Sequence, residues 1–291
     1  MPRSVEEGFT DFLVKLRATA TETEAAKKHR RSIEACLQNN FGLLRFTRIG
    51  SFGNGTSISG YSDVDYLACI PTNQLTQSSA YSLEKVKNAL SARFPLTGVR
   101  VNCPAITIPF GIYRSETTEI VPADYVKDDN YKIYEIANGA GGWMSVSPDA
   151  HNDYVTYVDN KLGGKVKPLI RFLKAWKFFR DVPISSFYLE MRVAKYAEEE
   201  EVIVYDIDVK NVLKILWDSQ LTRIQDPMGI SGYISACKTE AQKEAALSKL
   251  FKAFTRAEKA QQASIAENPQ LAFDGGDYFI TINFQTITTN D

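Results

Sequence analysis

Histidine and cysteine, the residues on which many metal sites and disulfides depend, are scarce in this sequence. Its 291 residues include only two histidines, His29 and His151, which nearly excludes metal chemistry based on imidazole. The cysteines are far apart and form no C-x-x-C pair, which argues against a zinc site and against a disulfide framework. We therefore expect all four to be core residues: Cys36, Cys69, Cys103 and Cys237.

Long apolar runs and an excess of charge are also missing. No run approaches about 18 apolar residues, so no transmembrane helix is expected. The first residues are acidic and lack an apolar core, so no signal peptide is expected either. Lys and Arg number 34 against 35 Asp and Glu, and this balance disfavours constitutive binding to nucleic acid or to an anionic membrane. The composition predicts a soluble, cytoplasmic protein with no membrane partner.

The hydrophobic pattern predicts an α/β part followed by a helical part. Ser4 and Glu7 fit a capping box for a first helix. Short apolar runs bounded by turn residues predict strands, and Pro122 is expected to end the last of them because it lacks an N–H. The Gly-rich residues 138–142 are expected to join the two parts. The strands are expected over 43–49, 63–70, 99–110 and 118–121, and residues 275–291 are expected to hold a short strand or an ordered tail.

Apolar residues at helical spacing predict helices on both sides of that junction. In the first part these cover 21–38 and 80–94. In the second part they cover 149–162, 165–180, 186–200, 207–218 and 239–265.

The most informative segment runs from residue 50 to residue 65. It reads Gly-Ser-Phe-Gly-Asn-Gly-Thr-Ser-Ile-Ser-Gly-Tyr-Ser-Asp-Val-Asp. Gly50 and Ser51 follow a predicted strand, and a turn of this kind exposes N–H groups that suit phosphate oxygens. Asp63 and Asp65 lie two residues apart on the next strand, so both carboxylates face one side. Because Mg²⁺ often binds one or two carboxylates plus substrate phosphates, the pattern favours a two-metal centre for phosphoryl or nucleotidyl transfer.

This segment resembles the signature of the polymerase-β-like nucleotidyltransferases, in which Gly-Ser and a loop precede Asp-x-Asp. The fuller match is similar to one branch, the bacterial CD-NTases, which are relatives of animal cyclic GMP–AMP synthase and of 2′-5′ oligoadenylate synthase. Other segments that resemble this branch cover 119–123, 143–151, 169–177 and 185–190.

The resemblance implies an α+β fold. Its core would be a polymerase-β-like nucleotidyltransferase domain, with a mixed β-sheet and flanking helices, followed by a C-terminal helical lobe. Residues 1–145 would form the N-terminal helix and the core. Residues 146–291 would form the helical lobe that closes the nucleotide cleft.

The resemblance also implies which carboxylates do the chemistry. Asp63, Asp65 and a third acid would be catalytic and would bind two Mg²⁺ ions, for which Mn²⁺ can substitute. Glu119 aligns with the third acid of the family. Asp124 is the alternative, although strand parity puts it on the opposite face from Glu119.

The implied nucleotide-binding residues come from both parts of the chain. Gly50 and Ser51 would bind phosphate in the first part. In the second, residues 161–180 hold seven Lys and Arg and no acid. The resemblance implies that Lys174 and Ser186 contact the donor phosphates, with Lys177 a weaker candidate. Phe187 or Tyr188 would stack on a base. A solvated helix face and core packing are the alternatives for these lysines and aromatic residues.

The function implied is that of a nucleotidyltransferase that joins NTPs into a cyclic di- or trinucleotide second messenger and releases pyrophosphate. The resemblance places it in anti-phage signalling of the CBASS type, with a downstream effector reached through the diffusible product. One alternative is a template-independent enzyme that modifies an RNA or protein acceptor, but the net charge of −1 does not favour a wide RNA-binding face. Another is a pseudo-enzyme, although nucleotide binding alone does not need three carboxylates.

Overall fold

The computed structural model describes residues 4–17, 20–60, 63–111 and 116–265. Contacts between residues divide the chain into two units. The first, which we call the sheet unit, contains residues 18–154 and 228–232. The second, which we call the helical unit, contains residues 1–17, 155–227 and 233–291.

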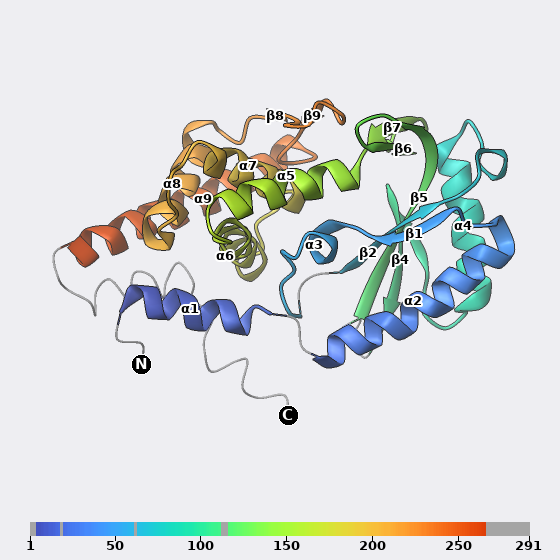
Figure 1. Ribbon diagram of the computed structural model, residues 1–291, viewed down its shortest axis with the longest axis horizontal. Helices are drawn as coiled ribbons and strands as arrows, with labels where there is room; N and C mark the ends of the chain where they lie inside the picture. Colours follow the sequence, from blue (N-terminus) through green and yellow to red (C-terminus); the bar gives the residue numbers. More distant parts are fainter. Residues whose placement is uncertain (1–3, 18–19, 61–62, 112–115, 266–291) are drawn as a thin grey trace. The chain divides into compact units, whose positions relative to one another are not determined.

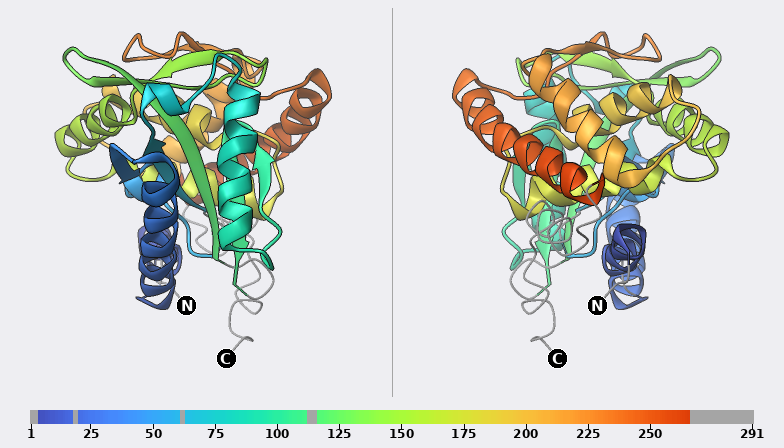
Figure 2. Two further views of the ribbon diagram at one scale, coloured as in Figure 1. Left: turned by 90° about the vertical axis from the view of Figure 1, so that its right-hand side faces the viewer. Right: turned by 90° about the vertical axis from the view of Figure 1, so that its left-hand side faces the viewer.

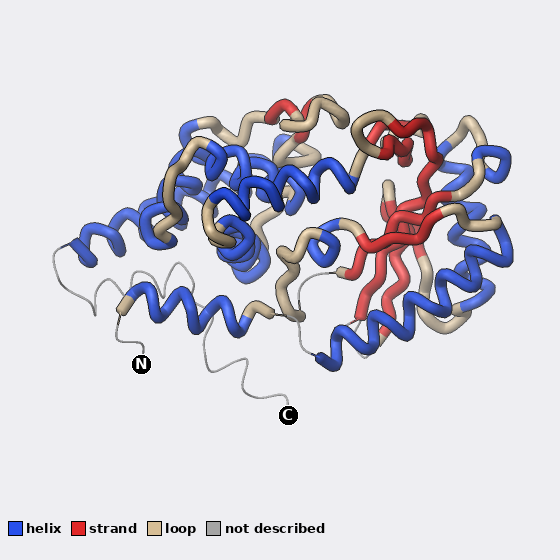
Figure 3. The backbone as a smooth tube through the Cα atoms, in the orientation of Figure 1, coloured by secondary structure: helices blue, strands red, loops and turns tan. Residues whose placement is uncertain are grey.

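A mixed β-sheet forms the centre of the sheet unit (Figures 1 and 3). Its order is β1-β2-β5-β4-β3, and β6 pairs with both β5 and β7. The β2–β5 pair is parallel, whereas the other pairs of this sheet are antiparallel. The strands are β1 (Arg45–Arg48), β2 (Val64–Cys69), β3 (Arg100–Asn102), β4 (Ala105–Phe110), β5 (Glu116–Asp128), β6 (Lys132–Ala137) and β7 (Trp143–Val146).

Two helices, α2 (Ala20–Phe41) and α4 (Ser79–Arg93), cover one face of this sheet, as Figure 1 shows. Side chains alternate between the two faces of a strand, so even-numbered residues of β2 and β4 point toward these helices. The buried cluster includes Ile33, Leu37, Leu83, Val86, Tyr66, Ala68, Ile106 and Ile108. The opposite face carries a second apolar cluster that includes Leu67, Cys69, Val121 and Ala123.

The expectation that Pro122 ends a strand is wrong. Strand β5 continues through Pro122 to Asp128. Ala123 accepts a hydrogen bond from Ile70 N on the β2 side, so Pro122 points to the other side of β5. On that side the pairing changes from β4, which pairs up to Ile120, to β6, which pairs from Ala123. The missing N–H therefore falls where the partner strand changes, a position that tolerates proline.

Two further expectations need correction. The run over 99–110 forms not one strand but the hairpin of β3 and β4. The Gly-rich residues 138–142 connect β6 to β7 within the sheet unit and do not join the two parts of the chain. The chain instead passes from one unit to the other inside helix α5 (Pro148–Lys161), at Tyr154 and Val155.

The helical unit contains the helices expected from the apolar periodicity, to within about two residues at each end. They are α6 (Val166–Phe179), α7 (Ser186–Glu198), α8 (Tyr205–Asp218) and α9 (Glu240–Ile265), besides α1 (Val5–Lys15) and the rest of α5. Helices α8 and α9 lie side by side, as the right-hand view of Figure 2 shows. A hairpin of β8 (Ile224–Gln225) and β9 (Tyr233–Ile234) follows α8. The short strand or ordered tail expected over 275–291 lies outside the described residues.

Helix α1 begins at the predicted capping box and packs within the helical unit. Glu7 N donates to Ser4 Oγ at 3.2 Å, and Ser4 N donates to Glu7 Oε2 at 2.9 Å. The ring of Phe9 lies 5.0 Å from that of Phe172. Because of this packing, α1 belongs to the helical unit. The expected first domain, 1–145, had instead included α1 with the sheet.

Among the described helices, none is long and apolar enough to cross a membrane.

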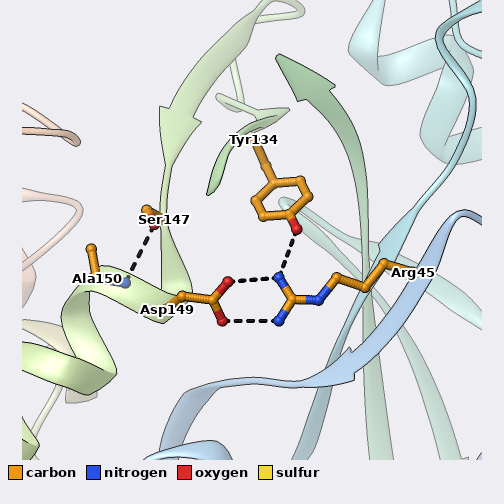
Figure 4. A network of polar contacts seen from close by, with 5 residues as sticks. All are labelled: Arg45, Tyr134, Ser147, Asp149 and Ala150. Carbon is orange, nitrogen blue, oxygen red and sulfur yellow. Dashed lines mark hydrogen bonds and ion pairs between the residues drawn. The ribbon is translucent and has the colours of Figure 1, made fainter. Parts of the chain in front are cut away.

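A bidentate ion pair anchors the start of α5 to the sheet (Figure 4). Arg45 of β1 donates from Nη1 to Asp149 Oδ2 at 2.6 Å and from Nη2 to Oδ1 at 2.9 Å. Arg45 Nη1 also donates to the hydroxyl of Tyr134 at 2.6 Å, and Ser147 Oγ accepts from Ala150 N at 3.3 Å. Hydrogen bonding to Asp149 raises the pKa of Arg45, so the pair stays ionised.

Substituting Arg45→Met should destabilise the sheet unit. It removes two charge-assisted hydrogen bonds, each worth about 1.5–3 kcal/mol, while keeping much of the side-chain volume. We expect the melting temperature to fall by several degrees in calorimetry. Lys214→Met is the control, because its ion pair with Asp218 lies on the exposed surface of α8 and is worth at most about 0.5 kcal/mol. Equal shifts for the two variants would contradict a structural role for Arg45.

Candidate active site

Two of the predicted carboxylates are neighbours on adjacent strands. In the parallel β2–β5 pair, Asp65 is the register partner of Glu119. Both residues are half-buried and lie on the face that α2 and α4 do not cover, in line with Leu67 and Val121. Asp63 is exposed and directly precedes β2. Strand pairing therefore brings together residues that are more than fifty positions apart in the chain.

The predicted Gly-Ser turn lies against Asp65. Ile49 N donates to the carbonyl oxygen of Asp65 at 2.9 Å, which extends the β1–β2 ladder by one residue. Gly50 follows with a φ of +60°, a backbone conformation that residues other than glycine rarely adopt. A Cβ atom at Gly50 would lie 2.2 Å from Asp65 Oδ2. The absence of a side chain at Gly50 is what lets the carboxylate approach the turn.

Gly50→Ala should therefore displace Asp65 and lower activity. A shift of about 1 Å at a reacting group can cost about a hundredfold in rate. Gly55→Ala is the matched control, since Gly55 has a φ of +71° but its Cβ would meet nothing within 4 Å. Both variants carry the backbone strain, so their melting temperatures should fall by similar amounts. Turnover that falls equally in both would show that contact with Asp65 does not matter.

A short helix, α3 (Gly50–Gly53), begins at this turn. Backbone hydrogen bonds close it: Asn54 N donates to Gly50 O at 3.0 Å, and Thr56 N donates to Ser51 O at 2.8 Å. The first N–H groups of a helix have no partner within the helix, and these groups belong to Gly50 and Ser51. The turn is thus fixed by its own backbone, and Gly50 at its start lies against the carboxylate of Asp65.

Glu119 and Asp124 lie in different surroundings. Glu119 Oε1 accepts hydrogen bonds from Thr107 Oγ1 at 2.9 Å and from Asn102 Nδ2 at 3.1 Å. Asp124 points to the other face of β5, and its Oδ1 accepts a hydrogen bond from Thr72 Oγ1 at 2.7 Å. Of the two candidates for the third acid, only Glu119 is the register partner of Asp65.

The donor atoms suit Mg²⁺ or Mn²⁺. In the described part of the chain, no three His, Cys, Asp or Glu side chains are gathered closely enough to hold a metal ion by themselves. Mg²⁺, however, usually binds one or two carboxylates and completes its shell with water and substrate phosphates. Asp65 and Glu119 on one face, beside a turn suited to phosphate, match that ligand set. Asp63 lies directly before β2, and its role as a further metal ligand stays a prediction.

In the helical unit, the structure brings Ser186 together with Lys177. Lys177 Nζ donates to Ser186 Oγ at 2.6 Å, and it lies 4.4 Å from the centroid of the Phe178 ring. Phe187 is exposed, as stacking on a base would need. Tyr188 is buried and donates its hydroxyl to Thr222 O at 2.8 Å, which makes it a core residue. Burial also raises the pKa of Tyr188.

Lys174 is buried and forms an ion pair, so the alternative of a solvated helix face does not hold for it. Its side chain is 1% exposed, and its Nζ lies 3.5 Å from Oε1 of Glu190, which is 7% exposed. The predicted contact of Lys174 with donor phosphates stays a prediction. Removing the cation would take this ion-pair partner from a buried carboxylate, and breaking a buried pair costs about 3–5 kcal/mol. Loss of activity in Lys174→Ala alone would therefore not distinguish binding from folding.

Two residues beside Glu119 were not expected from the sequence. Thr107 is a polar residue in the otherwise apolar strand β4, and that exception is the signal that could have singled it out. Asn102 lies at the end of β3, within an Asn-Cys-Pro turn that carries no distinctive pattern.

A mixed sheet with paired acids beside a Gly-Ser turn defines a nucleotidyltransferase core. The family profile described as "Second Messenger Oligonucleotide or Dinucleotide Synthetase domain" matches residues 3–158, more than half of the chain. The chain belongs to this family, as the resemblance of its motifs to bacterial CD-NTases predicted.

Individual relatives agree with this assignment. A probable cyclic nucleotide synthase of Bacillus cereus strain VD146 is 28% identical over 62% of this chain. The match spans 58% of that relative's length. The structure of CdnC from Escherichia coli MS115-1 with ATP matches with a TM-score of 0.74 and 18% identity, covering 95% of this chain and 98% of CdnC. The CdnE cyclic dinucleotide synthase of Elizabethkingia meningoseptica matches with a TM-score of 0.66 and 16% identity, covering 86% and 97%. These structures confirm the expected α+β fold with a C-terminal helical region.

Proposed function

We propose that this protein joins NTPs into a cyclic di- or trinucleotide and releases pyrophosphate. The observation that carries the proposal is the pairing of Asp65 with Glu119 beside the Gly50-Ser51 turn, in a chain of this family. Names of relatives support it. One is called a probable cyclic nucleotide synthase, and another is described as a cyclic dinucleotide synthase with GTP and Apcpp.

The residues of the sheet unit would hold the metal and the phosphates. Asp63, Asp65 and Glu119 would supply carboxylate oxygens for two Mg²⁺ ions. When bound, Mg²⁺ would neutralise the triphosphate and favour loss of the proton from an acceptor hydroxyl. The N–H groups of Gly50 and Ser51 would donate to phosphate oxygens, in a turn that needs no rearrangement to do so.

The reaction then forms one bond and breaks one. The oxygen of a ribose hydroxyl attacks the α-phosphorus of the donor NTP in line with the leaving group. The bond between the α-phosphorus and the bridging oxygen breaks, pyrophosphate leaves with the electron pair, and the hydroxyl proton passes to solvent. In the last step, the second for a dinucleotide and the third for a trinucleotide, the free hydroxyl of the linear intermediate attacks its own remaining α-phosphorus. The bond from that phosphorus to the bridging oxygen breaks, another pyrophosphate leaves, and the ring closes. The protein contributes position and electrostatics in every step.

We also propose the biological setting that the resemblance to bacterial CD-NTases implies. The cyclic product would serve as a messenger in anti-phage signalling of the CBASS type and would reach its effector by diffusion. Such an enzyme uses the NTP pool of the cytoplasm and needs no membrane or bound nucleic acid.

A product assay tests the proposed function. The purified protein is incubated with four labelled NTPs and Mg²⁺ or Mn²⁺, treated with phosphatase, and its products are separated. We expect a labelled species that resists phosphatase and forms without added RNA. Label that appears only in an added RNA or in a protein band would instead support a nucleotidyltransferase with a different acceptor. No incorporation under any condition would contradict the proposal.

The Lys177–Ser186 contact yields a prediction about NTP binding. If Lys177 binds phosphate and Ser186 orients its ammonium group, Lys177→Ala should raise the apparent KM for NTP about tenfold or more. Ser186→Ala should have a smaller effect, and the double variant should resemble Lys177→Ala, because the two residues act through one contact. Steady-state kinetics at saturating Mg²⁺ measure this. The control is Lys214→Ala, on the exposed surface of α8. An unchanged KM in Lys177→Ala would remove this residue from the binding site.

A further inference from the structure

The carboxylate of Glu119 is held from one side. Both of its hydrogen bonds within the described residues end on Oε1, one from Thr107 Oγ1 at 2.9 Å and one from Asn102 Nδ2 at 3.1 Å. Thr107 belongs to β4, which is next to β5 in the sheet, and Asn102 to β3, the strand beyond β4. A glutamate side chain has one more rotatable bond than an aspartate, so its carboxylate needs more contacts to be fixed in one orientation.

Thr107 is placed for this contact by the sheet itself. It is the register partner of Glu119 in the antiparallel β4–β5 pair and is 2% exposed. Its strand neighbours Ile106 and Ile108 point to the opposite face, into the core beneath α2 and α4. A buried hydroxyl is costly unless it is paired, and the hydroxyl of Thr107 donates to Glu119. Asn102 reaches the same oxygen from the end of the hairpin.

We propose that Thr107 and Asn102 are positioning residues for the metal site. By holding Oε1 they fix the plane of the carboxylate and leave Oε2 to bind the metal beside Asp65. This inference rests on the proposed function, because it assigns Glu119 to the metal. Partners that orient a metal ligand typically contribute about 10–100-fold to metal affinity or activity.

Direct measurement of Mn²⁺ binding tests the proposal without turnover. The probe is Mn²⁺ followed by electron paramagnetic resonance, with the protein and a non-hydrolysable ATP analogue. Thr107→Val removes the hydroxyl at nearly constant volume and should raise the Kd for Mn²⁺ about 10–100-fold. Thr107→Ser keeps the hydroxyl and should restore most of the affinity. An affinity for Mn²⁺ in Thr107→Val equal to that of the wild type overturns the proposal.

The matched control is Thr118→Val. Thr118 is 1% exposed and precedes Glu119 on β5, but it faces the other side, where its hydroxyl lies 3.4 Å from Glu116 O. It should lower stability about as much as Thr107→Val while leaving Mn²⁺ affinity unchanged. Equal losses of affinity in the two variants would show a general effect of packing and contradict the positioning role.

Asn102→Ala provides a second test if Thr107→Val does not fold, because Asn102 is exposed. It should weaken Mn²⁺ binding with little change in melting temperature, and unchanged binding contradicts the proposal. In activity assays, both variants should need about 10–100-fold more Mg²⁺ to reach half-maximal rate and should regain kcat at high Mg²⁺. A wild type that binds Mn²⁺ but makes no product would contradict the proposed function and leave the test of positioning intact.

Discussion

Replacing both Asp63 and Asp65 with asparagine should abolish product formation. The two substitutions keep side-chain size but remove two negative charges from the face that carries Glu119. Charge stabilisation by bound metal is worth several kcal/mol in the transition state, so the rate should fall at least about a thousandfold. Stability should not fall, because carboxylates close together repel one another when no cation is bound.

Turnover and melting temperature measured on the same preparations separate chemistry from folding. Asp124→Asn is a suitable control, since it removes one carboxylate from the same sheet on the opposite face of β5. Near-normal turnover in the Asp63→Asn, Asp65→Asn double variant would exclude these residues as the catalytic centre.

Glu119→Gln should lose most activity, whereas Asp124→Asn should keep most of it. Glu119 is the register partner of Asp65, and its substitution replaces a charged ligand with a neutral amide. We expect a loss of about a hundredfold or more, since each 1.36 kcal/mol of lost transition-state stabilisation is tenfold in rate. Asp124 instead accepts a hydrogen bond from Thr72 and faces away from Asp65.

Comparing the activities of Glu119→Gln and Asp124→Asn identifies the third acid. The reverse pattern, an inactive Asp124→Asn and an active Glu119→Gln, would show that the third acid is Asp124. Loss in both would indicate that Asp124 supports the site through other residues. Melting temperatures should be recorded for each variant, because Glu119→Gln also alters the hydrogen bonds from Thr107 and Asn102.

Local patterns predicted much of the fold and the centre of the site. The capping box of α1, the helical spacing of the second half and the strand at Asp65 depend on neighbouring residues only, and the structure has all three. The parity of a strand also placed Glu119 and Asp124 on opposite faces correctly. The sequence pattern did not show why residue 50 must be glycine. The structure gives the reason, because Asp65 Oδ2 lies where a Cβ atom of residue 50 would be.

Features that depend on partners distant in sequence could not be predicted in this way. We expected the strand to end at Pro122, and this prediction was wrong. Strand β5 continues there because its neighbour changes from β4 to β6 at that residue, so the missing N–H breaks no ladder. Strands β6 and β7 were not recognised, since they are short and are held by pairing with each other and with the second half of β5, which is distant from β7 in sequence.

The burial of Lys174 shows the same limit for side chains. Its spacing from Arg171 and Lys177 indicated a basic helix face, but its ion-pair partner, Glu190, lies on the following helix. No pattern within α6 reveals that contact. Likewise, Thr107 stands out in the sequence only as a polar residue in an apolar strand, and its contact with Glu119 follows from the register of β4 and β5.

The stoichiometry of pyrophosphate release tests the central claim most directly. Closing a ring breaks one α–β phosphate bond for every nucleotide in the product, whereas a linear chain keeps one triphosphate unreacted. With purified protein, NTPs and Mg²⁺, we predict one pyrophosphate per nucleotide incorporated, in a product that resists phosphatase. A ratio clearly below one, with a product that phosphatase shortens or dephosphorylates, would contradict synthesis of a cyclic oligonucleotide.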